Sequence, residues 1–365
     1  MTFSSGGTER QVYLLSKALA QKGIQVHLVI YIKGGHFWDE VQGPINNLTV
    51  YGLYESEPEN RLKRYIQLLI KAPFALRKII QQSRSSAIMS FLYWGNIIGL
   101  LSNLFLNSKL YWNIRDANLN LEKKEMVSLY LNRALSFIPK SIISNSHEAV
   151  TLHKKIGFSK SKFKVIANGF NTEEFYHDPK AASQFKTNHQ LNDKKIILNV
   201  GRIHKKKRHD LFLSNLKHLH KVDQRVVGVI AGSGDLGLKN HLQSKFPDTP
   251  CLWLDDIKDL RPIYSSANIL ILSSDSEAFP NVVAEAMLCE LPVISSKVGD
   301  VPFLLKQIRL YETSDLETLF KISSELIQKS EASLRKEGQN NRQIILQKYA
   351  IEAIVDEYIE FLNYK

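Results

Sequence analysis

The sequence predicts an α/β protein made of two doubly wound domains, each built around a mainly parallel sheet. Short apolar runs rich in β-branched residues alternate with longer amphipathic stretches in both halves of the chain. Strands separated by helical patterns are typical of βαβ units, and runs that are apolar throughout indicate strands covered on both faces. A length of 365 residues also exceeds one comfortable core, so two domains are expected.

The predicted strands fall into two series. In the first half they are residues 25–30, 48–52, 87–91, 110–114, 141–146 and 163–169, and in the second half 195–201, 225–232, 250–255, 267–274 and 292–296. The two series place the domains at residues 1–172 and 173–349. Residues 314–365 are predicted to be helical, and the last helix, about 350–365, is expected to pack back on the first domain.

The first domain is expected to lack the strand that usually opens a doubly wound domain. A doubly wound domain usually opens with a strand that leads into this turn, but the Ser-Ser-Gly-Gly run arrives at residues 4–7 with no strand in front of it. Either the gene start is misplaced or the domain has lost a central strand. The second explanation is costly, because an open sheet centre leaves backbone groups unpaired.

The composition is that of a soluble globular protein, with 44% hydrophobic and 23% charged residues. Cys251 and Cys289 both lie in apolar surroundings, which indicates buried thiols in a cytosolic protein. The N-terminus lacks the features of a secretory signal, and no run of 18 apolar residues is found. The apolar stretch 91–106 is interpreted as a strand end followed by a buried helix.

The positive charge is concentrated in the first half of the chain. Of the net charge of +12, residues 1–175 carry 22 basic and 12 acidic residues, or +10, and the remainder carries +2. An anionic surface or ligand is therefore expected at the first half, and both nucleic acid and an anionic membrane fit. Residues 61–84, with a kink at Pro73, form a basic amphipathic pattern that suits a membrane surface or an ordinary surface helix equally.

Two glutamates flank a helix start at residues 276–287. Glu277 follows the strand at 267–274, and Pro280 keeps it on a loop because the residue before a proline avoids helical dihedrals. Pro280 and Asn281 suit a helix start, which places Glu285 about one turn into the helix. Ligands bind outside the carboxyl ends of such strands, and carboxylates accept hydrogen bonds from hydroxyl groups. A helix-dipole role for Glu285, or the paired carboxylates of a glycoside hydrolase, are the alternatives.

A basic loop follows the strand that ends at Gly201. It holds Arg202, Lys205, Lys206, Lys207 and Arg208. Cations between a strand end and a helix N-terminus form a site for phosphate oxygens, whereas a solvated basic loop is the alternative. Glycine turns at Gly232, at Gly6-Gly7 and in residues 298–303 are further places where backbone can approach a ligand or simply turn tightly.

Taken together, these segments resemble the retaining glycosyltransferases of family 4, which have the GT-B fold of two Rossmann-like domains facing a central cleft. Glu277 and Glu285 match the family's pair of glutamates separated by seven residues, and Gly201-Arg202 with Lys207 match its basic loop. The remaining matches are Gly6-Gly7, residues 112–116, 144–150 and 164–175.

The resemblance implies a role for each matching residue. Glu285 would bind the ribose of a sugar nucleotide, Glu277 the transferred sugar, and Arg202 and Lys207 the diphosphate. Further donor-binding positions would be Gly201, Phe279, Pro280, Asn281, Val282 and Gly232, and Gly6 and Gly7 would form an acceptor or phosphate loop. Arg115 stands nearest to the place where many members have a catalytic histidine, so we expect a site role for it.

The sequence departs from the family at two glycines, which are replaced by Ala278 and Glu290. Family members retain the anomeric configuration and need no metal or other cofactor, and no acidic pair suited to hold Mg²⁺ stands out here. The donor is expected to be a UDP- or GDP-sugar.

The function expected from the resemblance is transfer of a sugar from a nucleotide-sugar donor to a glycan or lipid-linked saccharide in bacterial capsule, O-antigen or lipopolysaccharide synthesis. The enzyme would be cytoplasmic and peripheral on the inner face of the cell membrane. A nucleotide-sugar epimerase of the same fold and a glycan hydrolase or phosphorylase are the enzymatic alternatives. A nucleic-acid-binding protein is disfavoured because no base-reading helix or aromatic platform is found.

Overall fold

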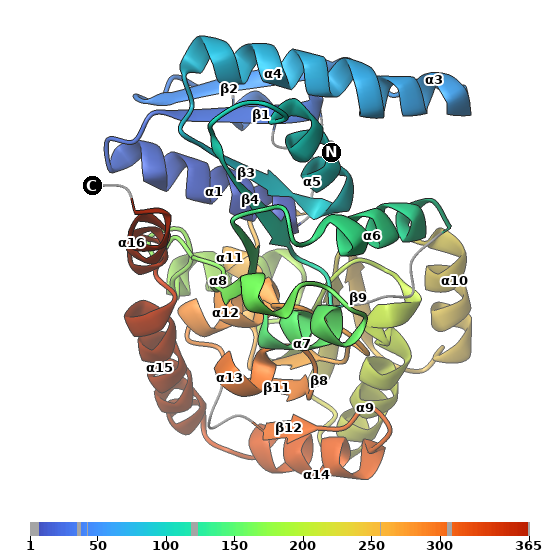
Figure 1. The fold of residues 1–365 in the computed structure, drawn as a ribbon. Helices are drawn as coiled ribbons and strands as arrows, with labels where there is room; N and C mark the ends of the chain where they lie inside the picture. Colours follow the sequence, from blue (N-terminus) through green and yellow to red (C-terminus); the bar gives the residue numbers. More distant parts are fainter. Residues whose placement is uncertain are drawn as a thin grey trace. The chain divides into compact units, whose positions relative to one another are not determined.

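The computed structural model describes residues 7–34, 38–41, 43–117, 123–255, 257–304 and 309–363. The chain divides into two compact units, of which the first comprises Met1–Gly169 and Ile351–Lys365 and the second comprises Phe170–Ala350. Each unit is an α/β structure with parallel strands, which confirms the predicted fold class (Figure 1).

The first unit contains six described strands arranged in two separate sheets. They are β1 (Val26–Ile32), β2 (Leu48–Tyr54), β3 (Ala87–Phe91), β4 (Lys109–Ile114), β5 (Ser141–Ser144) and β6 (Phe163–Val165). β1 pairs with β2, and β3 to β6 form a second sheet in chain order, with every pair parallel. Among the described residues no ladder joins β1 to β3, so the two sheets are separate.

Helices cover both faces of these strands. They are α1 (Gly7–Gln21), α2 (Trp38–Val41), α3 (Arg61–Ile66), α4 (Ala72–Ser83), α5 (Leu92–Ser102), α6 (Lys123–Leu135), α7 (His147–Lys155) and α16 (Ile351–Leu362), with a 3-10 turn η2 at Lys160–Lys162. Figure 1 shows β1 and β2 between α4 on one face and α1 on the other. The C-terminal helix α16 packs beside α1, where Leu15 and Ile354 share a buried cluster with Tyr111 of β4.

The basic stretch 61–84 is helical but not continuous. Between α3 and α4 lies a π-helical turn, η1 (Gln67–Lys71), which ends just before Pro73 in the first turn of α4. Proline has no N–H and its ring crowds the preceding turn, so the regular helical pattern changes at this point. At the position of the expected kink, the helix therefore widens into the π-helical turn η1. The stretch 91–106 contains the end of β3 and the buried helix α5, as predicted.

The second unit has a single six-stranded parallel sheet in the order β12-β11-β10-β7-β8-β9. The strands are β7 (Lys195–Val200), β8 (Val226–Ala231), β9 (Cys251–Leu254), β10 (Ile269–Leu272), β11 (Val293–Ser296) and β12 (Arg309–Tyr311). The strand β12 was not predicted, because three residues are too few for a recognisable pattern. The strand order reverses between β7 and β10, which makes their carboxyl ends the topological switch point where doubly wound sheets bind ligands.

The helices of the second unit are α8 (Pro179–Asn188), α9 (His209–Val222), α10 (Leu236–Lys245), α11 (Arg261–Ser266), α12 (Asn281–Leu288), α13 (Val301–Leu304), α14 (Leu316–Ile327) and α15 (Glu331–Lys348), with a 3-10 turn η3 at Lys205–Lys207. Phe212 and Leu216 of α9 pack with Leu319 and Leu326 of α14 against the fully buried Ile197 of β7. This core lies beneath the loops of the switch point.

Two further sequence expectations concern the thiols and the membrane. Both cysteines are free; Cys289 is buried, whereas Cys251 is only partly buried, which corrects the expectation that both are enclosed. No helix within the described ranges has the length and apolar character needed to cross a bilayer.

Candidate functional site

The candidate site lies at the switch point of the second unit. β7 and β10 pair directly, with Ile197 opposite Ile269 and Leu198 opposite Leu270. The basic loop follows β7, and the loop with Glu277 follows β10. Since parallel strands end at the same edge of a sheet, two segments about 70 residues apart in sequence are brought together here.

The basic loop is fixed through its backbone. After Gly201 the chain forms the 3-10 turn η3, and Arg208 adopts a left-handed conformation with φ of 49° before α9 begins. The Ser273 hydroxyl donates to the Lys207 carbonyl at 2.8 Å, and the Asp275 N–H donates to the Lys206 carbonyl at 2.8 Å. The loop after β10 therefore holds the loop after β7 in place.

The segment after β10 has the predicted arrangement. Glu277 lies on a loop, Pro280 occupies the N-cap of α12, and Glu285 lies one turn inside that helix. The carboxylate of Glu285 accepts a hydrogen bond from the Tyr264 hydroxyl at 3.0 Å and is only 6% exposed. Nearly complete burial of a carboxylate requires polar partners, so Glu285 is held in one orientation.

An ion pair joins the two loops. The ammonium Nζ of Lys207 lies 2.5 Å from Oε1 of Glu277, and the two side chains are 24% and 15% exposed. The Lys207 methylene groups pack beside Gly201, where a β-carbon would lie 3.5 Å from them, an ordinary van der Waals contact. A cation and a carboxylate are thus presented together at the strand ends, where they can meet phosphate and hydroxyl groups.

The other cations of the loop have different surroundings. Arg208 donates to Asp210 through Nε and Nη2 and to Asp275 through Nη1, at 3.0–3.1 Å. These hydrogen bonds raise the pKa of the Arg208 guanidinium. The side chain of Arg202 is exposed. The side chain of Arg208 therefore stabilises the fold through its carboxylate partners, whereas Arg202 is accessible to a ligand.

The lowered pKa of His204 indicates the positive charge of the loop. Partial burial lowers the pKa of its imidazole, and the charges of Lys206, Arg202 and Lys207 lower it further. The neutral ring accepts a hydrogen bond from the Lys206 N–H at 3.2 Å through Nδ1. Three cations close enough to act on one imidazole form an electrostatic environment suited to a polyanion.

Two of the predicted glycine turns support the loops directly. A side chain at residue 232 would place its β-carbon 2.3 Å from the Gly201 carbonyl oxygen, which is too close, so only glycine fits beside the loop after β7. In the turn at 298–303, a β-carbon at Gly299 would lie 2.4 Å from the carbonyl oxygen of Glu277. Gly299 was expected to approach a ligand, but in the structure its close neighbour is the backbone that carries Glu277.

The residues between the two glutamates lie in mixed environments. Phe279 is buried and packs against Phe170 and Tyr349, with ring centroids 5.9 and 5.8 Å away. Pro280 is also buried, whereas Asn281 and Val282 are partly exposed at the start of α12. Donor contacts by these residues remain predictions.

The predicted residues of the first unit form a separate group. Arg115 follows β4, and its Nε donates to Asn113 at 2.8 Å, its Nη1 to Asn168 and its Nη2 to the Tyr358 hydroxyl at 3.2 Å. Burial lowers the pKa of this guanidinium, and Tyr358 opposes that effect. The network ties the end of β4 to α16, and a ligand role for Arg115 remains a prediction. Gly7 is the first residue of α1, whereas Gly6 lies outside the described residues.

Sequence reasoning missed several residues that build the site. The side chain of Glu285 is oriented by Tyr264, and the backbone of Lys207 and Lys206 is held by Ser273 and Asp275. Arg208 was grouped with the ligand-binding cations, whereas it donates hydrogen bonds to Asp275. No local pattern marks these partners, since each contact depends on which strands are neighbours. The described residues include no group of three or more His, Cys, Asp or Glu side chains that could hold a metal ion.

Two family models match the chain, one in each half. Residues 5–174 match the model described as Glycosyltransferase Family 4, and residues 181–343 match the model described as Glycosyl transferases group 1.

Known proteins resemble the chain over almost its whole length. A Campylobacter jejuni protein named GalNAc-alpha-(1->4)-GalNAc-alpha-(1->3)-diNAcBac-PP-undecaprenol alpha-1,4-N-acetyl-D-galactosaminyltransferase is 24% identical, over 99% of this chain and 96% of its own. The structure of Anabaena Alr3699/HepE in complex with UDP and glucose superposes with a TM-score of 0.83 at 16% identity, covering 100% and 98% of the two chains. The structure of WaaG, a glycosyltransferase involved in lipopolysaccharide biosynthesis, gives a TM-score of 0.75 at 11% identity, covering 100% and 98%.

Proposed function

We propose that this chain, which is a glycosyltransferase with the GT-B fold, transfers a sugar from a UDP- or GDP-sugar to a glycan or lipid-linked saccharide. The observation that carries the proposal is the contact between Lys207 and Glu277 at the switch point of the second unit. It joins a group suited to phosphate and a group suited to sugar hydroxyls within one small site.

The cations stabilise the leaving group in this proposal. Breaking the bond between sugar and diphosphate increases the negative charge on the diphosphate oxygens. The Lys207 ammonium has three N–H donors, of which one meets Glu277, so two can serve phosphate oxygens. Exposed Arg202 adds a second, forked cation. Fixed positive charges that meet developing negative charge lower the barrier because they bind the transition state more strongly than the substrate.

The carboxylates position the donor. Glu285 can accept ribose hydroxyls while it keeps its hydrogen bond from Tyr264, since a carboxylate offers about four acceptor sites. Glu277 holds Lys207 with one oxygen, and its second oxygen can accept a hydroxyl of the transferred sugar. We propose that the reaction retains the anomeric configuration and that these side-chain cations perform the charge neutralisation that a metal would otherwise provide.

The similar proteins support this proposal. The Anabaena structure contains UDP and glucose, and the Campylobacter protein is named for an undecaprenol-linked saccharide. We therefore place this enzyme in the synthesis of a bacterial surface polysaccharide, with a lipid-linked saccharide as the acceptor class.

A thermal-shift screen with UDP-, GDP- and ADP-sugars tests the donor assignment. A ligand at 100 times its Kd stabilises the native state by about 2.7 kcal/mol, which raises the Tm of a unit of this size by about 5–10 °C. Lys207→Ala and Glu285→Ala are expected to lose this shift, and Lys205→Ala, an exposed lysine in the same turn, should keep it. The shift should also persist in EDTA.

Two results would contradict the assignment. If Lys207→Ala responds to the nucleotide sugar as the parent does, Lys207 does not bind phosphate. If the donor alone is converted to another nucleotide sugar, with no acceptor needed, the enzyme is an epimerase and not a transferase.

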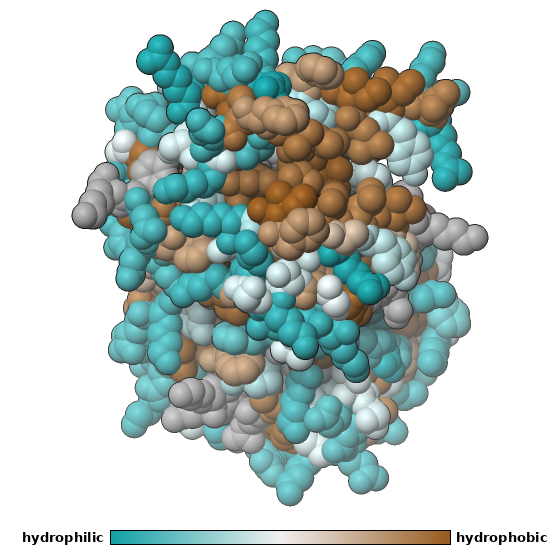
Figure 2. Space-filling model, in the orientation of Figure 1, coloured by the Kyte–Doolittle hydropathy of each residue, from teal (hydrophilic) through white to brown (hydrophobic). Residues whose placement is uncertain are grey.

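We further propose that the first unit rests on an anionic membrane through the segment α3–η1–α4. Its exposed face combines Leu62, Ile70 and Phe74, which are 69%, 52% and 71% exposed, with the exposed lysines Lys63 and Lys71. In Figure 2 the apolar residues on the side in view lie mainly over the first unit, including the region of α3 and α4. Large exposed apolar residues beside lysines are typical of helices that lie in a membrane interface.

Liposome flotation tests this surface. Binding is expected to vesicles with anionic lipid, to weaken with salt, and to decrease in Phe74→Ser. Phe303→Ser, which alters an exposed phenylalanine of the second unit, is the matched control. Equal binding to neutral and anionic vesicles would show that the basic surface does not recruit the protein.

A further inference from the structure

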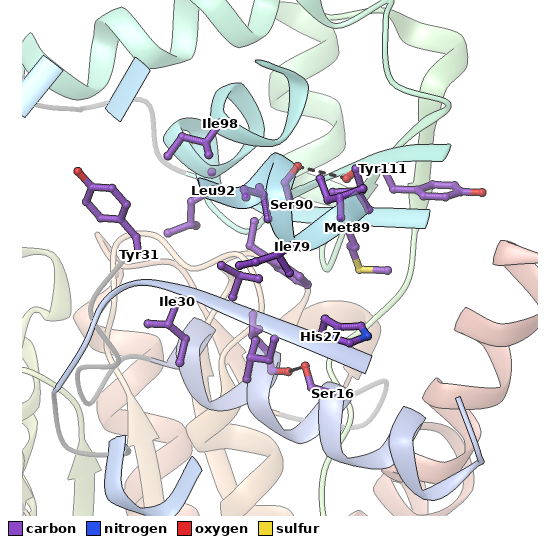
Figure 3. Close-up of a pocket in the computed structure, with 18 of the residues that line it drawn as sticks. Ser16, His27, Ile30, Tyr31, Ile79, Met89, Ser90, Leu92, Ile98 and Tyr111 are labelled. Atoms are coloured by element: carbon purple, nitrogen blue, oxygen red, sulfur yellow. Dashed lines mark hydrogen bonds between the residues drawn. The ribbon is translucent and has the colours of Figure 1, made fainter. Parts of the chain in front are cut away.

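A small charged cavity lies in the second unit, away from the candidate donor site. The larger cavity in the first unit, of about 1460 Å³, has a mainly apolar lining that includes Ile30, Ile79 and Leu92 (Figure 3). The cavity in the second unit measures about 220 Å³, and its walls include residues 264–268, before β10, and 289–292, before β11. Since parallel strands begin at the same edge of a sheet, this cavity lies at the edge opposite the switch point.

One wall of this cavity contains a glutamate where a glycine is favoured. At the end of α12 the Glu290 N–H donates to the Met287 carbonyl at 3.0 Å. The Leu291 N–H donates to the Ala286 carbonyl, also at 3.0 Å. In this capping pattern the residue in the position of Glu290 is left-handed and is usually glycine, and Glu290 has a φ of 59°. The glutamate therefore costs the fold free energy, and such backbone outliers gather at functional sites.

The Glu290 carboxylate gains little from the protein to offset this cost. Its side chain is 19% exposed, and its Oε2 atom is enclosed but accepts no hydrogen bond from the described residues. The Arg335 Nε atom lies 3.6 Å from Oε2, which is beyond hydrogen-bond distance. A buried acceptor without a hydrogen-bond donor is unfavourable. A donor group from a bound molecule would remove this penalty.

The charges around the cavity indicate the class of molecule that fits it. Lys186 and Arg335 supply positive charge to the lining. Glu290 and Glu331 supply negative charge. Burial, and then the charge of Arg335, lowers the pKa of His177, so its ring is uncharged near neutral pH. A lining in which cations and anions balance is complementary to a molecule that carries both charges itself.

We propose that this cavity binds a small zwitterion, of the class of free amino acids, and thereby regulates the donor site. The ammonium group of the zwitterion donates to the enclosed Oε2 of Glu290, and its carboxylate lies with Lys186 and Arg335. α12 also ends at the cavity, and the negative end of a helix favours a cation. The cavity is smaller than the roughly 300–1,000 Å³ of most ligand pockets, which suits a molecule of this size.

Two contacts link the cavity to Glu285. Tyr264 lines the cavity, and its hydroxyl donates to the Glu285 carboxylate at 3.0 Å. Cys289 also lines the cavity, and its N–H donates to the Glu285 carbonyl at 3.1 Å. Burial raises the pKa of the Cys289 thiol, and the nearby charge of Glu285 raises it further. A molecule in the cavity therefore packs against both residues that hold Glu285.

The regulatory step rests on the proposed function, in which Glu285 binds the ribose of the donor. An occupant of the cavity restricts Tyr264 and the end of α12 before the nucleotide arrives. Less ordering then remains for donor binding, so the affinity for the donor should rise. By linkage, the donor should raise the affinity for the zwitterion by the same factor.

Calorimetry and thermal unfolding of the full chain, without nucleotide, test the site. The probes are glycine, serine, valine and glutamine, and the controls are acetate and methylammonium, which carry one charge each. At least one amino acid should bind the parent and raise its Tm, and neither control should do so at the same concentration. Glu290→Gln should weaken binding about 10- to 150-fold, because a hydrogen bond between charged groups is lost.

Two variants separate loss of the site from loss of the fold. Glu290→Gly should lose amino-acid binding although the Tm of the ligand-free protein rises, since glycine suits the left-handed position. Glu312→Gln, which changes an exposed glutamate of the second unit outside the cavity, should bind as the parent does. The site is ruled out if none of these amino acids binds, if acetate gives the same response, or if Glu290→Gly binds as the parent does.

Donor titrations with and without the bound amino acid test the regulatory step. The nucleotide sugar should bind about fivefold or more tightly when the cavity is saturated. Tyr264→Phe, which removes only the hydroxyl that meets Glu285, should reduce this increase while the amino acid still binds. An unchanged donor affinity in the parent would show that the site does not regulate the enzyme. Failure of the donor assignment is a separate result, because amino-acid binding is measured without nucleotide.

Discussion

Replacement of Gly299 should displace the loop that carries Glu277, because Gly299 lies directly against the backbone of that loop. Its φ of +53° is a left-handed conformation, and a β-carbon there would lie 2.4 Å from the carbonyl oxygen of Glu277 and 2.5 Å from that of Ala278. Both obstacles are backbone atoms, and the loop is held at this point by the hydrogen bond from the Asp300 N–H to the Ala278 carbonyl at 3.0 Å. The change Gly299→Ala therefore forces the loop that carries Glu277 to move.

The size of the effect follows from these distances. Ordinary contact begins at 3.4 Å, so the loop must retreat by about 1 Å (3.4 less 2.4). The left-handed conformation alone costs a non-glycine residue about 1–2 kcal/mol, which lowers the Tm of a unit of this size by about 2–8 °C. A displacement of about 1 Å in a catalytic group can reduce the rate about 100-fold. We expect donor hydrolysis to fall by that factor, because the contact between Glu277 and Lys207 is lost.

The assay combines thermal unfolding with the rate of donor hydrolysis in the absence of acceptor. Gly237→Ala is the control, since this helical glycine has only the Asp235 carboxylate near its missing β-carbon, at 3.3 Å. Alanine there should leave the rate unchanged, because Gly237 lies in α10 and not against the loop that carries Glu277. If Gly299→Ala has the Tm and hydrolysis rate of the parent, the loop is not constrained by Gly299 and the reasoning is wrong.

Three further predictions address the basic loop and a replaced glycine. Lys207→Met should weaken binding of the identified nucleotide about 10- to 150-fold by calorimetry, because a hydrogen bond to a charged group contributes about 1.5–3 kcal/mol; Lys205→Met should change it little. A bound diphosphate offsets the cations that lower the pKa of His204, so the pKa should rise on binding and affinity should increase as pH falls. Calorimetry in buffers of different ionisation enthalpy should show proton uptake that His204→Gln removes. Glu290 has a left-handed φ of 59°, so Glu290→Gly should stabilise the second unit by up to about 1 kcal/mol, seen as a higher Tm.

Local sequence signals predicted the elements that carry the candidate site. The strand pattern located β7 and β10, and Pro280 correctly separated loop-borne Glu277 from helix-borne Glu285. These predictions succeed because apolar runs and proline geometry act over a few residues. The same approach missed β12, whose three residues have too little pattern to recognise.

Partners distant in sequence could not be found in this way. The hydrogen bonds of Arg208 with Asp275 and of Glu285 with Tyr264 depend on packing between separate elements. Likewise, no pattern in the sequence indicated that Gly299 would lie against the backbone of Glu277.

The sequence alone determined the α/β class, the order of the strands along the chain and the residue types available for phosphate and hydroxyl groups. Only the tertiary structure decided that β7 lies beside β10, which brings Lys207 within 2.5 Å of Glu277, and that β1 and β3 face a shared cavity. The physical reason is the distance along the chain over which each kind of interaction acts. Backbone preferences and apolar periodicity act between near neighbours in the chain, whereas contacts between loops depend on how strands order themselves when the whole core packs.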